Sequence, residues 1–272
     1  MDAHVISLAN QKGGTPKTTT SVNLGIGLAQ AGRKVLLVDA DAQGSLTLSL
    51  GWEPDELPIT LYDLMIKAIQ GRPVTLGDGM LHHEEGVDLL PANIELAGME
   101  MSLVSVMYHE TILKQVLEPY KHEYDYILID CAPSLGMMTI NALAATDGID
   151  VPTIPQHLPT KGIEKLLESV HQVRRGINPS LKIEGILMTL MDGRTVYERE
   201  ISEMIRKAYG GKINIFGTEI PRSVRAAETS AEGKSIFAYA PRSKVAEAYR
   251  QLTKEVLALE KQREEHRAEI GR

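Results

Sequence analysis

The chain has 272 residues, of which 43 % are hydrophobic and 24 % charged, and its formal net charge is −7. This length and apolar content are enough for a folded globular protein of one large or two ordinary domains. The single cysteine, Cys131, excludes an internal disulfide framework and any multi-cysteine metal site supplied by one chain.

Short apolar, β-branched runs alternate with longer segments of helical period, which is typical of βαβ units in a parallel sheet. The expected strands are 4–9, 34–39, 87–91, 126–130, 149–154 and 182–191, with a weaker one at 213–220. The expected helices are 18–31, 61–69, 111–120, 137–145, 163–175, 198–209 and 245–261. The fold predicted is therefore α/β, a mostly parallel twisted sheet flanked by helices on both faces.

The domain organisation follows from what separates these elements. No linker rich in Pro, Gly or Ser divides them, so we predict one domain over residues 1–272. The end of the chain, residues 262–272, is dense in mixed charge, and we expect it to be a solvated helix end that frays.

A stretch rich in Gly, Lys and Thr, NQKGGTPKTTTS at residues 10–21, lies between the first expected strand and the first expected helix. This is the context of a phosphate-binding loop, whose ordinary pattern is G-x-x-x-x-G-K-[ST]. Here Gln11 and Pro16 replace the two outer glycines, so the pattern alone does not decide whether the loop binds phosphate.

The remaining residues of this stretch have the chemistry that phosphate binding needs. Gly13 and Gly14 would let the backbone approach an anion, and the helix N-terminus presents free N–H groups. Lys17 adds a positive charge, and Thr18 has a hydroxyl placed to ligate Mg²⁺. The alternative is a chance Gly-Gly-x-x-Lys-Thr between unrelated elements.

Acidic residues end two further expected strands. Asp39 ends the second strand and Asp41 lies just beyond it, at the carboxyl edge where α/β sheets bind their ligands. Asp130 ends a later apolar run and fits a Walker B carboxylate that holds Mg²⁺ through water. An acid at a strand end is commonplace by itself. Together with the loop after the first strand, however, these acids give three phosphate- or metal-binding groups at three strand ends, which indicates a nucleotide site.

At this point a family resemblance becomes clear. KGGTPKT resembles the deviant Walker A motif K-G-G-x-x-K-[ST] of the ParA/MinD family of P-loop ATPases, with Lys12 as its additional lysine. The similarity continues through DADAQGS, through LIDCAPSLG and through IPRSVRAAETSAEGKSIFAYAPRSKVAEAYRQL. It covers nearly the whole chain, and its last block resembles the ParA (Soj-like) chromosome and plasmid partition branch.

The resemblance implies ATP and Mg²⁺ as cofactors and gives roles to the residues above. The residues implied to contact the nucleotide are Lys12, Gly13, Gly14, Thr15, Pro16, Lys17, Thr18 and Thr19. Lys17 and the loop amides would hold the β- and γ-phosphates. Thr18 and Asp130 would hold Mg²⁺, with Asp39 supporting the metal side.

Two implied roles concern turnover. Asp41 would position the attacking water, and Lys12 would reach across a homodimer to the partner's phosphates, so that Lys12, Lys17 and Asp41 form the catalytic set. Because phosphoryl transfer depends on positioning and charge neutralisation, a lysine that arrives on dimerisation makes hydrolysis conditional. The alternative for Lys12 is a solvated loop lysine.

Pro16 departs from the glycine that most relatives have. Proline lacks an N–H, so the loop loses one donor to the phosphates, worth about 0.5 to 1.5 kcal/mol or more to a charged acceptor. Alternatively, proline is favoured in the first turn of a helix and is tolerated there. We expect nucleotide binding with slow turnover.

The charge of the chain is unevenly distributed. Residues 194–254 contain twelve Lys or Arg against seven Glu, about +5, while the rest is acidic. Such cations neutralise phosphates without reading bases, so we expect non-specific double-stranded DNA binding, the alternative being a solvated surface. The candidate DNA-binding residues are Arg206, Lys207, Arg222, Arg225, Lys234, Arg242 and Lys244.

A membrane-bound, MinD-like protein is the alternative to DNA binding. The last helix carries a modest apolar stripe and mixed charge, whereas a membrane-surface helix has bulky apolar residues opposite a basic face. The N-terminus has no secretory signal, and no apolar run approaches the roughly 20 residues that span a bilayer. We therefore expect a cytoplasmic, nucleoid-associated protein without a membrane partner.

The sequence thus predicts an ATPase that dimerises on binding ATP, binds DNA and drives partition, with hydrolysis stimulated by a ParB-type partner protein. A nucleotide-sensing regulatory protein that hydrolyses poorly because of Pro16 is the alternative.

Overall fold

The structure, a computed structural model, describes residues 2–134, 136–155, 159–192 and 195–270. Its strands form one eight-stranded sheet in the order β3-β4-β2-β5-β1-β6-β7-β8. All neighbouring strands pair in parallel except β3 and β4. The strands are β1 His4–Leu8, β2 Val35–Ala40, β3 Leu81–His82, β4 Asp88–Leu90, β5 Tyr126–Cys131, β6 Gly148–Thr153, β7 Lys182–Met191 and β8 Ile215–Pro221.

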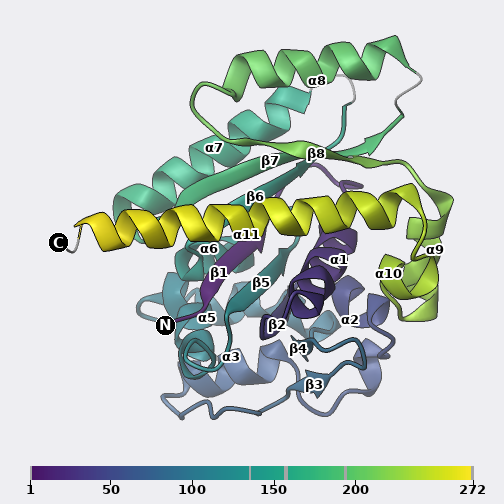
Figure 1. The fold of residues 1–272 in the computed structure, drawn as a ribbon. Coiled ribbons are helices and arrows are strands. Elements are labelled where there is room, and N and C mark those ends of the chain that lie inside the picture. Colours follow the sequence, from purple (N-terminus) through teal and green to yellow (C-terminus); the bar gives the residue numbers. More distant parts are fainter. Residues whose placement is uncertain (1, 135, 156–158, 193–194, 271–272) are drawn as a thin grey trace.

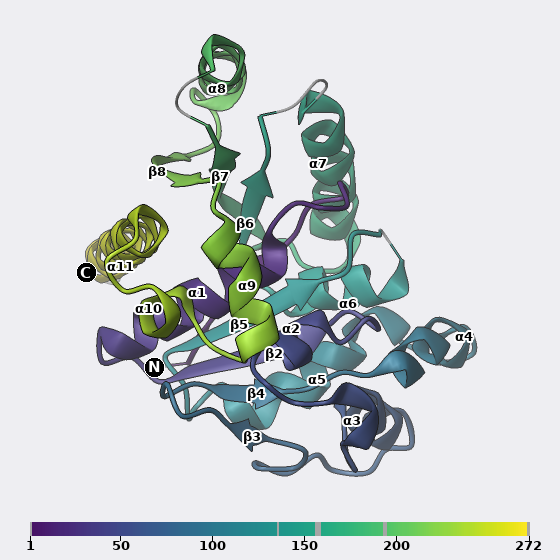
Figure 2. The same cartoon turned by 90° about the vertical axis from the view of Figure 1, so that its right-hand side faces the viewer.

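Helices cover both faces of the sheet (Figures 1 and 2). They are α1 Lys17–Gln30, α2 Ser45–Ser49, α3 Leu61–Ile69, α4 Met99–Leu103, α5 Ile112–Leu117, α6 Met137–Ala145, α7 Pro159–Gly176, α8 Val196–Tyr209, α9 Val224–Glu232, α10 Ile236–Tyr239 and α11 Lys244–Ile270. Among the described residues, no helix is both long and apolar enough to cross a bilayer. The predicted α/β fold with a mostly parallel sheet is confirmed, and it is the architecture expected of a single domain.

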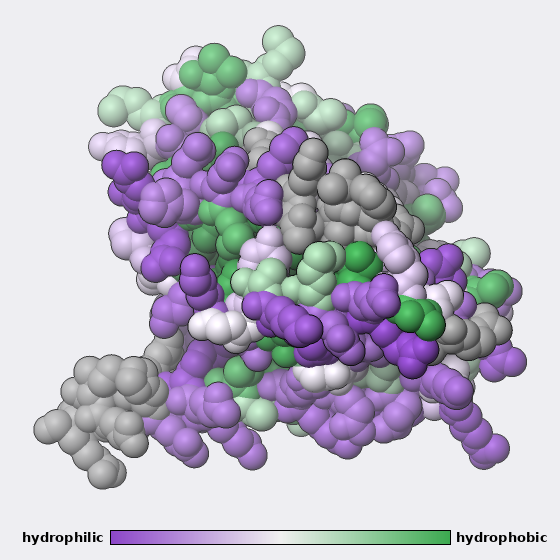
Figure 3. Space-filling model, turned by 90° about the horizontal axis from the view of Figure 1, so that it is seen from above, coloured by the Kyte–Doolittle hydropathy of each residue, from purple (hydrophilic) through white to green (hydrophobic). Residues whose placement is uncertain are grey.

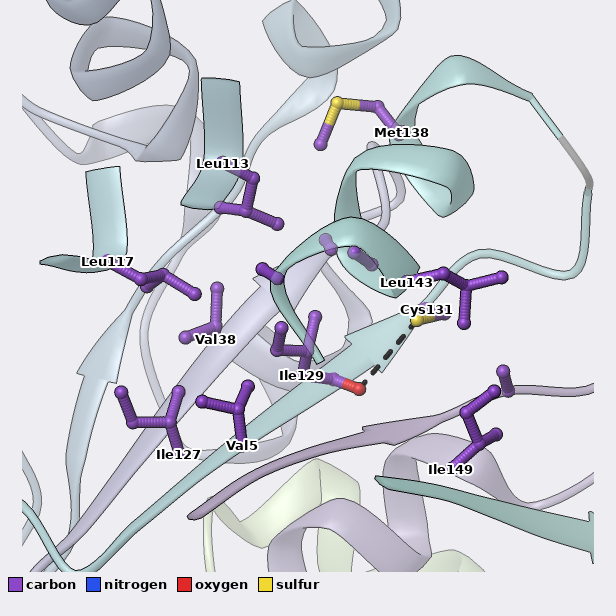
Figure 4. Close-up of a cluster of buried hydrophobic side chains, with 14 of the residues drawn as sticks. Val5, Val38, Leu113, Leu117, Ile127, Ile129, Cys131, Met138, Leu143 and Ile149 are labelled. Carbon is purple, nitrogen blue, oxygen red and sulfur yellow. Dashed lines mark hydrogen bonds between the residues drawn. The ribbon is translucent and has the colours of Figure 1, made fainter. Parts of the chain in front are cut away.

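The sheet is buried on both faces because its central strands are apolar throughout. Every residue of β2 and β5 is buried. Successive side chains of a strand point to opposite faces. Ile127 and Ile129 accordingly pack with α3, α5, α6 and α7, whereas Tyr126 and Leu128 pack with α1, α10 and α11. Figure 4 shows the first of these clusters, in which the Cys131 thiol donates a hydrogen bond to the carbonyl of Ile129 at 3.8 Å.

Helix α1 lies between the sheet and α11, and two glycines allow this close packing. A Cβ on Gly25 would lie 2.6 Å from Leu37 Cδ2, and one on Gly27 would lie 2.3 Å from Thr253 Oγ1. Both distances are too short for a real side chain, so these two positions require glycine. The tight packing fixes where α1 begins, and therefore where the preceding loop lies.

An ion-pair network joins α11 to the amino edge of the sheet. The Glu184 carboxylate on β7 accepts a hydrogen bond from His4 Nε2 at 2.7 Å and pairs with Arg263 of α11. Helix α11 runs to Ile270, nine residues beyond the end expected at residue 261, and Arg263 attaches it to the sheet within this extension. Fraying of residues 262–272 remains a prediction.

All seven expected strands are present, and the differences from the sequence prediction involve short elements. The sequence interpretation missed β3, α2, α4, α9 and α10, the longest of which has nine residues. Four of them have at most five residues, too few to show a period of 3.6 or 2, and α9 has Val224 as its one large apolar residue. The helix expected at 111–120 is shorter, because α5 ends at Leu117 and a 3₁₀ turn follows.

Candidate functional site

The loop of residues 9–16 follows β1 at the carboxyl edge of the sheet, and its own side chains hold its shape. The amide of Asn10 donates to the carbonyl of Pro152 on β6 at 2.7 Å, while its oxygen accepts from the Lys12 N–H at 3.0 Å. Thr15 Oγ1 donates to the Lys12 carbonyl at 3.0 Å. Asn10, which the sequence interpretation did not single out, therefore anchors the loop to the neighbouring strand.

Two glycines of this loop border open space. A Cβ on Gly13 or Gly14 would meet no atom within 4 Å, and Gly14 has φ of +75°, where glycine is favoured. The loop backbone therefore faces an open region next to the start of α1. N–H groups at the start of a helix attract an anion.

Pro16 is the N-cap of α1 and forms a tight turn. Its φ and ψ are −78° and 58°, close to the inverse γ-turn, and the Lys17 N–H donates to the Thr15 carbonyl at 2.8 Å across it. The Pro16 carbonyl accepts from Thr20 Oγ1 at 2.7 Å and so joins the first turn of the helix. The helix tolerates proline here, but two donors are lost to a ligand, because Pro16 has no N–H and the Lys17 N–H is engaged.

Thr18 and Asp130 meet where the sequence predicts a magnesium site. Strands β1 and β5 pair in register, with Leu8 opposite Asp130, so the end of β5 lies beside the start of α1. Thr18 Oγ1 donates to Asp130 Oδ2 at 2.6 Å, and Ser21 Oγ donates to Oδ1 at 3.2 Å. Hydroxyl and carboxylate oxygens are the ligands that Mg²⁺ prefers. Ser21 was missed, although its spacing of three from Thr18 on a helix places both on one face.

The two aspartates of DADAQGS have different surroundings. Asp39 is buried opposite Asp130, and its Oδ2 accepts from the N–H and the hydroxyl of Thr47 at 2.9 and 2.8 Å. Its Oδ1 accepts from the Asp41 N–H at 3.3 Å. Asp41 is partly exposed, and its Oδ1 accepts from the Gln43 N–H at 3.0 Å. Asp39 thus holds the chain on either side of the loop that carries Asp41.

Burial raises the pKa values of both buried carboxyls. It raises the pKa of Asp130 to about 6, although the Thr18 hydrogen bond and the charge of Lys17 act in the opposite direction. Burial and the charge of Asp130 raise the pKa of Asp39 to about 8, against the hydrogen bonds from Thr47. Lys17 is 6 % exposed, so one buried cation faces two buried acids. A divalent cation would compensate this excess of negative charge.

The remaining loop residues are placed as follows. Thr15 is buried, and Lys12 and Thr19 are partly buried. All eight residues predicted to contact nucleotide thus lie together in the loop and the first turn of α1. Asp130 lies at the carboxyl end of β5, the strand next to β1, and Asp39 and Asp41 lie at the carboxyl end of β2, one strand further along the sheet. The structure brings this predicted set to one place.

The predicted DNA-binding residues fall into two groups at opposite ends of β8. Arg206 near the end of α8 is bonded to the Phe216 carbonyl and to Glu219, at 3.3 and 3.2 Å, with Lys207 exposed beside it. The other group lies on or next to α9, α10 and the start of α11, at the right in Figure 1. It comprises Arg222, Arg225, Lys234, Arg242 and Lys244, all exposed.

In this second group, which we call the α9–α11 basic group, pairing with acids is weak. Arg222 Nη2 lies 3.9 Å from Glu198 Oε1. Within the described part of the chain, the other four form no ion pair. Their charge is available to a polyanion.

Comparison with known proteins places the chain in a family. A family model described as AAA domain matches residues 3–183. The sporulation initiation inhibitor protein Soj of Bacillus subtilis is 42 % identical over 254 residues, which cover 93 % of this chain and 98 % of Soj. The chromosome-partitioning ATPase Soj of Thermus thermophilus is 42 % identical over 253 residues, covering 93 % and 95 %.

A solved structure has the same fold. It is that of cobyrinic acid a,c-diamide synthase from Mycobacterium smegmatis with bound ATP analog and magnesium, with a TM-score of 0.81 and 36 % identity over 94 % of both chains. The loop after β1, the acids at the strand ends and the matches over nearly the whole chain all indicate the same family. The chain therefore belongs to the ParA/MinD family of P-loop ATPases, and within it to the Soj-like partition branch.

Proposed function

We propose that this protein is a partition ATPase that binds ATP and Mg²⁺ at the loop after β1. The observation that carries this proposal is the contact of 2.6 Å between Thr18 Oγ1 and Asp130 Oδ2, next to the buried Lys17. It supplies oxygen ligands for a cation and a positive charge for phosphate in one place. The chromosome-partitioning relative and the ATP analog and magnesium in the M. smegmatis structure support the same function.

Each residue of the site has a role in this proposal. Lys17 and the free loop amides bind the β- and γ-phosphates, while Thr18 and Asp130 hold Mg²⁺, which neutralises phosphate charge when bound. Asp41 is partly exposed and orients the attacking water. Asp39 supports the metal side by fixing the segment that carries Asp41.

The proposal includes ATP-dependent dimerisation. Lys12 extends from the loop of one protomer to the phosphates of its partner, so that dimer formation depends on bound ATP. A charge supplied by a second protomer resembles an arginine finger in its effect on phosphoryl transfer. Alanine at position 12 should then abolish the ATP-dependent dimer in analytical ultracentrifugation.

DNA binding and partition rest on the α9–α11 basic group. A dimer doubles these cations, and binding through phosphates alone falls steeply with salt. The ATP-bound dimer would thus stay on nucleoid DNA until a ParB-type partner stimulates hydrolysis. DNA binding that persists without nucleotide at high salt would contradict this part of the proposal.

A poorly hydrolysing, nucleotide-sensing protein is the second candidate, and the turn at Pro16 favours it. Two donors are missing from the loop, which weakens contacts to the phosphates. Calorimetry with ATP and Mg²⁺ tests binding, and phosphate release with DNA and partner tests turnover. Binding without stimulated release would support the second candidate, and no heat of binding would overturn both.

A further inference from the structure

A hollow of about 390 Å³ lies between α7, the start of β7 and the segment joining α8 to β8. It lies at the amino end of β7, whereas the nucleotide loop lies at the carboxyl end of β1. In a parallel sheet these are opposite edges, so this α7–β7 hollow is separate from the proposed ATP site. Its lining residues are Leu167, Val170, His171, Arg174, Lys182, Ile183, Lys212 and Ile213.

The floor of the hollow is apolar. Val170 is 4 % exposed, and Leu167, Ile183 and Ile213 are partly buried and pack on the core cluster of that face. The view from above in Figure 3 shows apolar side chains, in green, between hydrophilic ones, in purple. An apolar floor left partly open to water gains free energy when a partner covers it, at about 25 cal/mol per Å².

The rim of the hollow is cationic and lacks matching acids. Arg174, Lys182 and Lys212 are exposed, and no carboxylate lines the hollow. Among the described residues, none of the three side chains forms an ion pair or hydrogen bond. The acid nearest in sequence, Glu184, does not line the hollow and bonds instead to His4.

This unpaired state contrasts with the state of four arginines elsewhere. Arg33, Arg206, Arg250 and Arg263 each pair with a glutamate of this chain. The cations of the hollow, like four of the α9–α11 basic group, are thus unpaired among the described residues, on a chain that is acidic as a whole. They are available to carboxylates from another molecule.

We propose that the α7–β7 hollow docks an acidic segment of a partner protein, with an apolar side chain on the floor and carboxylates at the rim. An apolar centre within a polar rim is the usual arrangement of protein interfaces. A DNA duplex is convex and gains little from an apolar floor, and a small anion is normally held by fixed, convergent polar groups rather than by exposed lysines. A basic segment would be repelled here.

The test is a selection from a library of random twelve-residue displayed peptides on the full-length protein. Peptides are kept when they bind the wild type but not the triple variant Arg174→Glu, Lys182→Glu, Lys212→Glu. A matched control carries Lys114→Glu, Arg175→Glu and Lys254→Glu, which changes the same charge at exposed positions outside the hollow. Arg175 neighbours Arg174 on α7 but does not line the hollow, so the control also tests whether the position of the charge matters.

We expect the retained peptides to be rich in Asp, Glu and large apolar residues. A labelled synthetic copy should bind the triple variant roughly tenfold more weakly than the control, as for the loss of three exposed ion pairs. Ile213→Ser should weaken it too, while ATP binding stays at the wild-type level in every variant.

Three results would overturn the proposal. The first is that no peptide distinguishes the triple variant from the control. The second is that the retained peptides are basic. The third is that the triple variant, but not the control, loses affinity for a DNA duplex, which would make the hollow part of a nucleic-acid surface.

Discussion

The two edges of the sheet bury acidic residues in different ways. At the amino edge, Glu184 is 9 % exposed and meets its cationic partners directly, His4 and Arg263. At the carboxyl edge, the Asp130 carboxylate accepts hydrogen bonds from the hydroxyls of Thr18 and Ser21 and faces the cation Lys17, and open space lies in front of the neighbouring glycines. In the first arrangement the acid is paired with cations of the same chain, although Asp150 Oδ1 and Arg263 Nη2 nearby are buried without a hydrogen-bond partner among the described residues. The second has room and negative charge left for a cation. We therefore expect buried charge to stabilise the fold at one edge and to serve a ligand at the other.

The largest expected effect is at the amino edge, with Glu184→Ala. Removing one partner of a buried ion pair leaves the other uncompensated, and we expect the free energy of unfolding to fall by about 3 kcal/mol. Chemical denaturation measures this loss. ATP affinity should not change, and a loss of ATP binding in the folded variant would contradict the division of the two edges.

The same prediction has a pH dependence. Burial opposes ionisation of Glu184, but the hydrogen bond and charge of His4 and the charge of Arg263 outweigh it and lower its pKa. Because the pKa of Glu184 is lower in the folded chain than in the unfolded chain, its ionisation stabilises the fold at pH values above the ordinary pKa of 4.5. This stabilisation is lost as the pH falls through the folded-state pKa. The difference between wild type and Glu184→Gln in unfolding experiments should therefore shrink below about pH 4.5.

Lys17→Ala should produce the converse result at the carboxyl edge. Charge-assisted hydrogen bonds to phosphate are lost, so calorimetry should show roughly hundredfold weaker ATP binding. The thermal midpoint should change little, because among the described residues the Lys17 side chain donates no hydrogen bond, and its backbone N–H, which bonds to Thr15, is kept in the variant. Lys34→Ala, at an exposed position on the amino edge, is the control and should bind ATP normally.

Pro16→Gly should change both the affinity for ATP and the stability of the fold. Glycine restores an N–H and frees the turn that engages the Lys17 N–H, so ATP should bind up to about tenfold more tightly. The flexible residue also destabilises the fold by about 0.4 to 1 kcal/mol through the unfolded chain. Titration calorimetry and denaturation measure the two effects. Pro16→Ala restores the N–H with less flexibility, and equal ATP affinity of all three proteins would mean that the turn does not limit binding.

Thr47→Val should have the smallest effect of these substitutions. It would sharpen the comparison of the two edges, because it removes hydrogen bonds that hold the fold at the carboxyl edge, where we expect the ligand. Its hydroxyl donates to Asp39 and accepts from the Ala92 N–H at 3.1 Å. Losing both bonds should cost about 1 kcal/mol of stability. It should also slow phosphate release a few-fold without changing ATP affinity, because Asp41 is held through Asp39. Thr47→Ser keeps the hydroxyl and should behave as wild type.

The sequence was sufficient for the parts of this site that lie at ends of long elements. Continuous apolar runs ending in Asp39 and Asp130 predict buried parallel strands and their carboxyl edge, and the loop between β1 and α1 follows from its position. Asn10 and Thr47 could not be recognised, because their roles depend on which backbone groups neighbouring strands and loops bring beside them. That arrangement is set by strand register and by packing, and neither produces a periodic pattern in the local sequence.

The direction of one hydrogen bond limits what the loop can accept. Thr18 gives its only proton to Asp130, so the lone pairs of its oxygen are turned toward the open region. The wall of the pocket at this point is electron-rich and has no hydrogen to offer. It would attract a hard cation and repel a bare oxyanion, so phosphate can approach this side only when an ion stands between them.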